Sequence, residues 1–220
     1  MAKFFLPVLL IASTSATFAL TKEEQDALLN AHNSLRADLA NGRAVNDDNT
    51  TLPAGKNIYK LNIDPTIEAM AQKYADKCVF EHSSQKERNG TGENLYMGGK
   101  QSYKDVLVDA SNLWWSELKE NGFHNPDLIL TQEEWDNGIG HWSQMAWAQT
   151  KLIGCGVTYC ENQGTIVVCN YSPAGNYIDS PVYEKGSPCK QATECTTVPD
   201  SKCDSSGLCC DPANLQCSSA

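Results

Sequence analysis

Ten cysteines constrain most strongly how this 220-residue chain can fold. The first is Cys78, and six of the ten lie between Cys189 and Cys217. An even number in a chain of this size suggests five disulfides and an oxidising compartment. A zinc-finger arrangement is the alternative, but it needs paired cysteines followed by histidines, and here all four histidines precede the second cysteine, Cys155. The cysteines therefore favour a secreted, disulfide-held protein.

The N-terminus is typical of a secretory signal peptide. Lys3 is followed by an apolar run to Ala12, and small residues supply candidate cleavage sites after Ala16 and after Ala19. The alternative is a membrane anchor, but the run is shorter than the ~20 residues that a spanning helix needs. We assign residues 1–19 to the signal peptide and expect a secreted, extracellular protein without a transmembrane segment.

The charge balance limits the classes of partner. Without Lys3, 16 of the 17 basic side chains remain against 27 acidic ones, a net charge of −11. This argues against nucleic acid and anionic membrane surfaces as partners. Three Asn-x-Ser/Thr sequons are present. We expect glycosylation at Asn49 and Asn89, which lie in polar loops, whereas Asn170 falls in a predicted strand and should be inaccessible.

The periodicity of residues 20–180 predicts one α+β domain. Thr21 and Glu24 form a capping box before a helix that ends at Asn41-Gly42, and later helices begin at Asp64-Pro65 and after Ser102. Residues 152–160 and 165–171 predict two strands of a hairpin, and a further strand is expected near Glu93. We expect helices packed against a central antiparallel sheet.

The predicted hairpin suggests two disulfides. If Glu161–Gly164 is a four-residue loop, Cys160 faces Thr165, and Cys155 lies one position from opposite Cys169. A Cys155–Cys169 link is then geometrically reasonable. Cys160 is left for Cys78, the other cysteine of this region.

Residues 181–220 predict a separate, cysteine-rich C-terminal extension. A tail this short cannot bury enough apolar surface to fold without cross-links. We expect its six cysteines to pair among themselves, although the sequence leaves all 15 pairings open. These are Cys189, Cys195, Cys203, Cys209, Cys210 and Cys217.

Four residues are candidates for a functional cleft: His82, Glu93, Glu117 and His141. His141 lies in the Gly-rich stretch Gly138–Trp147, and His82 and Glu93 lie in or beside a polar loop. Glu117 continues the helical stripe of Val106, Ala110 and Leu113. A carboxylate in that register needs a partner or a wet cleft; the alternative is that the helix frays and Glu117 is solvated. We expect the four side chains to meet.

Six ordered stretches resemble the CAP superfamily of cysteine-rich secretory, antigen 5 and pathogenesis-related 1 proteins. They are Ala31-His-Asn-Ser-Leu-Arg36, His82-Ser83, Gly92-Glu-Asn-Leu95, Trp114-Trp-Ser-Glu117, Gly140-His-Trp-Ser-Gln144 and Val168-Cys-Asn-Tyr-Ser-Pro-Ala-Gly-Asn176. The size and the cysteine-rich tail are similar to the activation-associated secreted proteins of parasitic nematodes, which implies a role in host–parasite interaction. The resemblance implies a three-layer α/β/α sandwich with an open cleft that holds two histidines and two glutamates. It also implies a divalent metal, often zinc, at His82 and His141, or binding of sterols or fatty acids.

Two interpretations of the four residues remain open from sequence. Two imidazoles can ligate zinc while the glutamates orient rings or waters, or the four groups can form a hydrogen-bonded network that only braces the cleft. A hydrolase is the alternative function, a protease or esterase with Glu93 or Glu117 as base on a zinc-bound water, or with Ser83 or Ser143 as nucleophile.

The sequence favours a non-catalytic function. It contains neither a His-Glu-x-x-His helix nor a Gly-x-Ser-x-Gly turn, and two histidines are a smaller ligand set than the three of most zinc hydrolases. We therefore expect a secreted binding or immune-modulating protein. Its partner would be an extracellular protein or lipid, and the chain itself a monomer or weak homodimer.

Overall fold

A computed structural model describes residues 19–214 and Cys217. The predicted signal peptide lies outside the described residues apart from Ala19. No helix in the described part of the chain is long and apolar enough to cross a membrane. In chain order the elements are α1 Lys22–Ala40, β1 Gly55–Lys56, β2 Asn62–Ile63, α2 Pro65–Ala75, β3 Gly92–Gly98, α3 Tyr103–Asn121, β4 Ile129–Leu130, α4 Gln132–Asp136, α5 Gly140–Ala146, β5 Leu152–Cys160, β6 Gly164–Ser172, β7 Ser180–Pro181, β8 Glu184–Lys185, the 3-10 turn Ala192–Glu194, β9 Lys202–Cys203 and β10 Cys209–Cys210.

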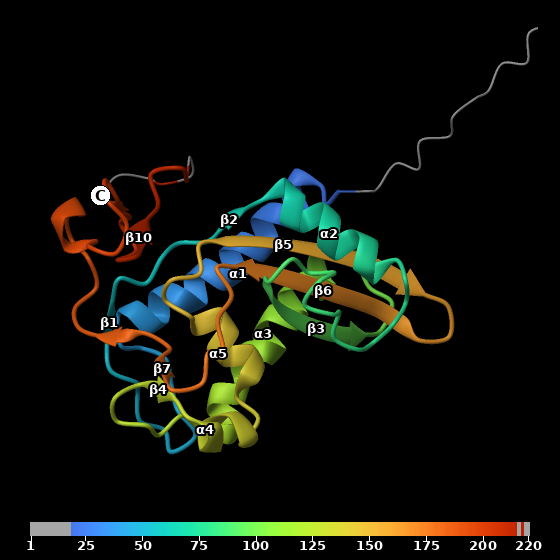
Figure 1. Cartoon of the computed structure of the whole chain (residues 1–220). Helices are drawn as coiled ribbons and strands as arrows, with labels where there is room; N and C mark the ends of the chain where they lie inside the picture. The colour runs from blue at the N-terminus through green and yellow to red at the C-terminus, as the bar shows by residue number, and fades with distance from the viewer. Residues whose placement is uncertain (1–18, 215–216, 218–220) are drawn as a thin grey trace, which may run out of the picture.

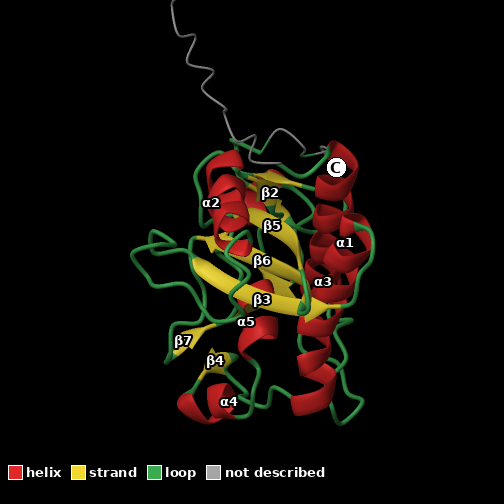
Figure 2. Ribbon diagram, turned by 90° about the vertical axis from the view of Figure 1, so that its right-hand side faces the viewer, coloured by secondary structure: helices red, strands yellow, loops and turns green. Residues whose placement is uncertain are grey.

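The core of the molecule is a four-stranded sheet between helices, in the strand order β2-β5-β6-β3. Helices α1 and α3 pack on one face of the sheet, and α2 packs on the other (Figures 1 and 2). The predicted three-layer α/β/α arrangement is therefore confirmed. The expectation of an antiparallel sheet is wrong at one edge, because β2 pairs parallel to β5.

The β5–β6 hairpin places two cysteines directly opposite each other. Cys155 faces Cys169 and Cys160 faces Gly164, so the predicted register is wrong by one residue. Its cause is the loop, which has three residues where the sequence suggested four. The disulfide Cys155–Cys169 links the two strands, and Cys78–Cys160 ties the segment after α2 to the end of β5.

Helix α2 lies unusually close to β5 because two strand positions lack side chains. A Cβ on Gly154 would come within 2.1 Å of the backbone nitrogen of Glu68, and one on Gly156 within 2.3 Å of the backbone of Gln72. The side chain of Gln72 uses this proximity: its Oε1 accepts the backbone N–H of Val157 at 3.0 Å, and its Nε2 donates to the carbonyl oxygen of Val157 at 3.1 Å.

The C-terminal cysteines form three disulfides among themselves: Cys189–Cys203, Cys195–Cys209 and Cys210–Cys217. Four of these cysteines surround the buried ring of Tyr59, whose hydroxyl lies 3.1 Å from the hydroxyl of Ser201. Two ion pairs, Lys60–Asp204 at 2.8 Å and Lys151–Asp211 at 2.7 Å, hold the same segment against the sandwich. In Figure 1 it lies, in red, at the end of the molecule away from the β5–β6 turn.

Residues just after position 180 pack with the sandwich. Val182 and Tyr183 are buried in the same core cluster as α1 and α5, and β7 and β8 pair with β4 and β1. Among the sequons, Asn49 and Asn89 are exposed and Asn170 is buried in β6. The predicted inaccessibility of Asn170 is therefore confirmed, and glycosylation of the other two stays a prediction.

Candidate functional site

Four side chains from four different segments line one pocket of about 260 Å³. His82 comes from the loop before β3, Glu93 from β3, Glu117 from α3 and His141 from α5. The structure thus brings together the four residues that the sequence grouped. Each histidine is paired with one of the glutamates, and the two pairs are built differently.

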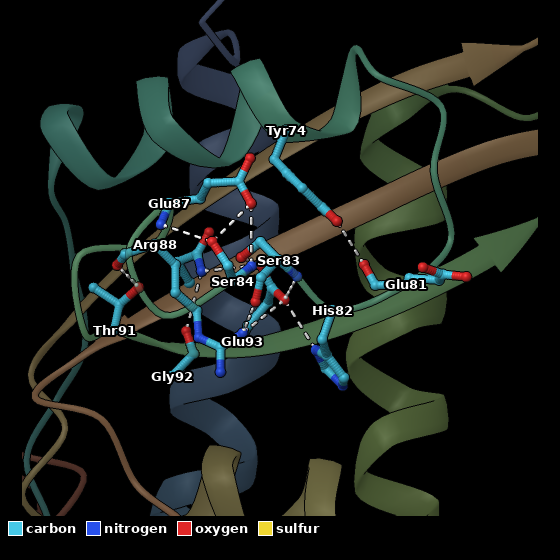
Figure 3. A network of polar contacts seen from close by, with 11 residues as sticks. Tyr74, Glu81, His82, Ser83, Ser84, Glu87, Arg88, Thr91, Gly92 and Glu93 are labelled. Atoms are coloured by element: carbon cyan, nitrogen blue, oxygen red, sulfur yellow. Dashed lines mark hydrogen bonds and ion pairs between the residues drawn. The ribbon is translucent and has the colours of Figure 1, made fainter.

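Glu93 is the buried anchor of the first pair. Its Oε1 accepts from Nδ1 of His82 at 2.9 Å and from the backbone N–H of Ser83 at 2.8 Å, while Oε2 accepts the Ser83 hydroxyl at 2.6 Å. Burial would raise the pKa of the Glu93 carboxyl, but the hydrogen bonds from His82 and Ser83 outweigh it and the pKa is lowered. Figure 3 shows this cradle, with the ring of His82 extending beyond β3 on the side away from α2.

Glu117 is the anchor of the second pair. Its Oε2 accepts the backbone N–H groups of His141 and Trp142 at 2.8 and 2.9 Å, and Oε1 lies 2.5 Å from Nδ1 of His141. The carboxylate therefore satisfies donors in the first turn of α5, which has no side-chain cap of its own. The ring of His141 also stacks on Trp114, with ring centroids 6.1 Å apart.

The helical stripe predicted to carry Glu117 is wrong in part. The buried face of α3 consists of Val106, Leu107, Ala110, Ser111, Trp114 and Leu118. Leu113, which the prediction placed on that face, is 55% exposed, because the stripe is rotated toward Trp114. Glu117 lies at the edge of the buried face with its side chain 18% exposed, and it is partnered rather than solvated.

Several residues that support the site had no assigned role from sequence. The Nδ2 groups of Asn94 and Asn176 donate to the carbonyl oxygens of His141 and Gly140, at 3.1 and 2.8 Å. Both asparagines occur in the motifs that resemble the CAP superfamily. For Asn94, a buried asparagine in a strand is the available signal, since an amide there must serve a specific polar partner.

Arg36 supports the segment that follows α5. It is fully buried and donates to five backbone carbonyl oxygens, of Tyr59, Met145, Trp147, Ala148 and Thr150. Burial lowers its pKa to about 9. A buried guanidinium held by carbonyl oxygens fixes the end of α5, and thereby the helix that carries His141.

The two remaining histidines lie outside the pocket. His32 is buried in the core: its Nδ1 donates to the carbonyl oxygen of Leu28 at 3.1 Å, and its Nε2 accepts the Tyr171 hydroxyl at 3.0 Å. Burial lowers the pKa of His32 to about 4. His124 is exposed and pairs with Asp47.

The ring geometry leaves one nitrogen of each pocket histidine for a ligand. Both carboxylates engage Nδ1, and among the described residues no hydrogen bond engages Nε2 of His82 or His141. A carboxylate partner on Nδ1 holds the neutral ring with its lone pair on Nε2, the arrangement typical of metal-ligating histidines. No three ligand atoms of the four side chains lie within 4.8 Å of one another. The four side chains therefore offer a cation at most the two imidazole nitrogens, and waters or a ligand would have to complete its shell.

Both serine candidates are buried and hydrogen-bonded. The Ser83 hydroxyl donates to Glu93, and Ser83 is 5% exposed. The Ser143 hydroxyl donates to Oδ1 of Asn176 at 2.7 Å, and Ser143 is completely buried. Each hydroxyl thus has a hydrogen-bond acceptor within the protein.

Two further hollows adjoin the pocket along β3. This strand forms one edge of the sheet (Figure 2). His82 and Glu93 also line a hollow of about 590 Å³ that reaches Tyr177, and Glu117 and His141 also line one of about 380 Å³ that reaches Leu113. Of the nine exposed large hydrophobic side chains among the described residues, five line these hollows. They are Phe80, Met97, Leu113, Trp135 and Tyr177.

The comparisons with known proteins agree with this architecture. The family model described as CAP, the cysteine-rich secretory protein family, matches residues 29–171. The chain belongs to the CAP family. Ancylostoma secreted protein of Ancylostoma caninum is 36% identical over 199 residues, which are 88% of this chain but 45% of that relative. Venom allergen 5 of Microctonus hyperodae is 37% identical over 173 residues, 74% of this chain and 72% of the relative.

Solved CAP structures share the fold closely. BmVAL-1 superposes with a TM-score of 0.82 at 36% identity, covering 87% of this chain and 96% of its own. NaASP2, whose structure was solved with Zn²⁺, gives a TM-score of 0.78 at 34% identity, covering 88% and 97%. The predicted resemblance to the CAP superfamily and to nematode secreted proteins is thus confirmed.

Proposed function

We propose that this CAP protein is a secreted, non-catalytic binding protein whose cleft holds a divalent cation, zinc, through Nε2 of His82 and His141. The observation that carries the proposal is the double His–Glu pairing, in which each glutamate fixes Nδ1 of its histidine. A bound zinc ion would supply a Lewis-acidic centre for a ligand's oxygen or nitrogen atoms. The zinc in the NaASP2 structure supports the choice of metal.

The hydrogen bonds made by the glutamates and serines of the cleft support the non-catalytic assignment. Glu93 and Glu117 each accept three hydrogen bonds from the residues they hold, so both act as orienting groups rather than as poised bases. The two candidate hydroxyls are likewise committed. The exposed apolar and aromatic side chains along the cleft are typical of a surface that binds an extracellular protein or a lipid.

Five disulfides favour an extracellular location, since such bonds persist in oxidising compartments. By analogy with the secreted nematode and venom relatives, we propose that the partner belongs to a host, where binding would modulate an immune response. The hydrolase alternative gains no support from the geometry.

Calorimetric titration with zinc at pH 7.5 tests the proposal, on protein purified without nickel affinity. We expect one ion per chain and a more than tenfold loss of affinity in His82→Ala and in His141→Ala, because one imidazole with waters is a weak ligand set. His124→Ala is the matched control, since His124 is as exposed as His82 but lies outside the cleft. Unchanged affinity in both cleft variants would refute the metal site. Peptide or ester hydrolysis lost in Glu93→Gln and Glu117→Gln would refute the non-catalytic assignment.

A further inference from the structure

The backbone nitrogen of Leu20 donates to a buried carboxylate, Oε1 of Glu68 on α2, at 3.1 Å. Glu68 is 2% exposed, and the Leu20 side chain packs into the core between α1, α3 and the sheet. The chain is therefore anchored in the fold from Leu20 onward, whereas the residue before it, Ala19, is exposed.

Glu68 is short of positive charge. Its other oxygen accepts Nε2 of Gln25 at 2.8 Å, so both of its donors are neutral. No lysine, arginine or histidine of the described residues forms an ion pair with it, and the charged side chain whose field reaches it is Glu24 on α1, another carboxylate. Burial raises the pKa of Glu68, and the repulsion from Glu24 adds to this effect. A buried carboxylate in this setting is costly unless a cation approaches it.

The missing cation can come from processing of the chain. We propose that cleavage between Ala19 and Leu20 creates an α-ammonium group on Leu20, which forms a buried ion pair with Glu68. Hydrolysis consumes one water: the carboxylate leaves with Ala19, and the freed amine of Leu20 takes up a proton. The backbone nitrogen that donates as a neutral amide in the full chain then donates as a cation, at the same position.

An ion pair at Leu20 requires cleavage after Ala19 rather than after Ala16. Cleavage after Ala16 would leave three residues before Leu20, and its nitrogen would remain a neutral amide. The positive end of the α1 dipole opposes an ammonium there, but Glu24 and Glu68 bring two negative charges to the same place. Removal of the signal peptide would thus stabilise the folded protein as well as complete its targeting.

The test compares two forms of the chain, one beginning at Leu20 and one at Ala19. At pH 7 we expect the Leu20 form to melt about 3–6 °C higher, the shift that a domain of this size shows for a tenfold change in its folding constant. In Glu68→Gln the difference should disappear. Glu23→Gln changes an exposed glutamate in the first turn of α1 and should leave the difference between the two forms unchanged.

The pH dependence gives a second, independent readout. The ordinary pKa of an α-amino group is about 7.7–8.0, and pairing with Glu68 raises it in the folded state. The extra stability is therefore present below about pH 8 and is lost as the pH rises toward 10. Equal melting of the two forms at pH 7, or a difference that survives Glu68→Gln, would overturn the ion pair. A secreted protein whose first residue is Thr17 would overturn the cleavage site.

Discussion

Glu117 holds His141 at two points, its backbone N–H and its Nδ1, at 2.8 and 2.5 Å. Because the same carboxylate caps the first turn of α5, the orientation of the imidazole and the start of its helix depend on one side chain. Glu93 holds His82 in a comparable way through Ser83. The cleft therefore presents two rings whose tautomer is set by the fold.

The Glu117 contact predicts a loss of zinc affinity without a loss of fold. In Glu117→Gln one acceptor oxygen becomes an NH₂ group that faces N–H donors, so the ring is no longer held in its tautomer. We expect zinc affinity to fall about 10–100-fold, the usual effect of changing the carboxylate behind a metal-binding histidine. Glu120→Gln, three residues further along α3, should leave the affinity unchanged. Calorimetry measures both, and equal affinities in the two variants would contradict the role of Glu117.

Arg36 predicts a large stability effect. Arg36→Met removes the guanidinium from five backbone carbonyl oxygens, of which those of Trp147 and Ala148 keep a backbone N–H donor, so we expect the free energy of unfolding to drop by about 3–5 kcal/mol. Arg43→Met removes an exposed guanidinium that pairs with Asp38. It should change the free energy of unfolding by less than about 0.5 kcal/mol. Denaturant unfolding with intact disulfides gives both values. Similar small losses would show that α5 does not depend on the guanidinium.

We expect buried His32 to make the stability of the protein depend on pH. Its folded pKa of about 4 lies below the ordinary value of 6.5, so the unfolded state binds a proton that the folded state does not. As far as His32 is concerned, the free energy of unfolding is highest above about pH 6.5. It declines by about 1.4 kcal/mol per pH unit as the pH falls to about 4. In His32→Asn this part of the slope should vanish, whereas His124→Asn should retain it. A slope that is the same in the His32 variant would contradict the assignment.

We expect removal of the long-range disulfide to cost more stability than removal of the short-range one. Cys78–Cys160 spans 82 residues and Cys210–Cys217 spans 7. On the chain-entropy model, replacing both cysteines of a pair by alanine should cost about 4.5 kcal/mol for Cys78–Cys160 and about 2.4 kcal/mol for Cys210–Cys217. Thermal unfolding of the two double variants compares them. Losses in the reverse order would mean that strain or packing, rather than loop closure, determines their effect.

The sequence predicted the helices well because their ends carry strong local signals. The capping box Thr21–Glu24 and the Asp64-Pro65 start both appear in the structure. The parallel strand β2 was missed because two residues, Asn62 and Ile63, carry no periodicity. The hairpin register was off by one because Gly164 serves as a strand residue rather than as part of the loop.

The sequence predicted which four residues line the cleft, but not the residues that hold them in place. The motifs that contain them made the four cleft residues identifiable: His82, Glu93, Glu117 and His141. The predicted buried face of α3 wrongly included Leu113, because the observed face is rotated toward Trp114. Arg36 could not be assigned, because a helical arginine is normally exposed and its five carbonyl partners come from segments more than 20 residues away in sequence. Tertiary contacts of this kind have no local signature.

The most direct test of the central claim is an anomalous-scattering map from crystals grown with zinc, with data collected at the zinc absorption edge. We predict one strong peak in the cleft, about 2.0–2.1 Å from Nε2 of both His82 and His141. Glu93 and Glu117 should remain hydrogen-bonded to Nδ1 of their histidines. A cleft without a peak, or a peak bound through other residues while the two rings keep only their glutamate partners, would contradict it.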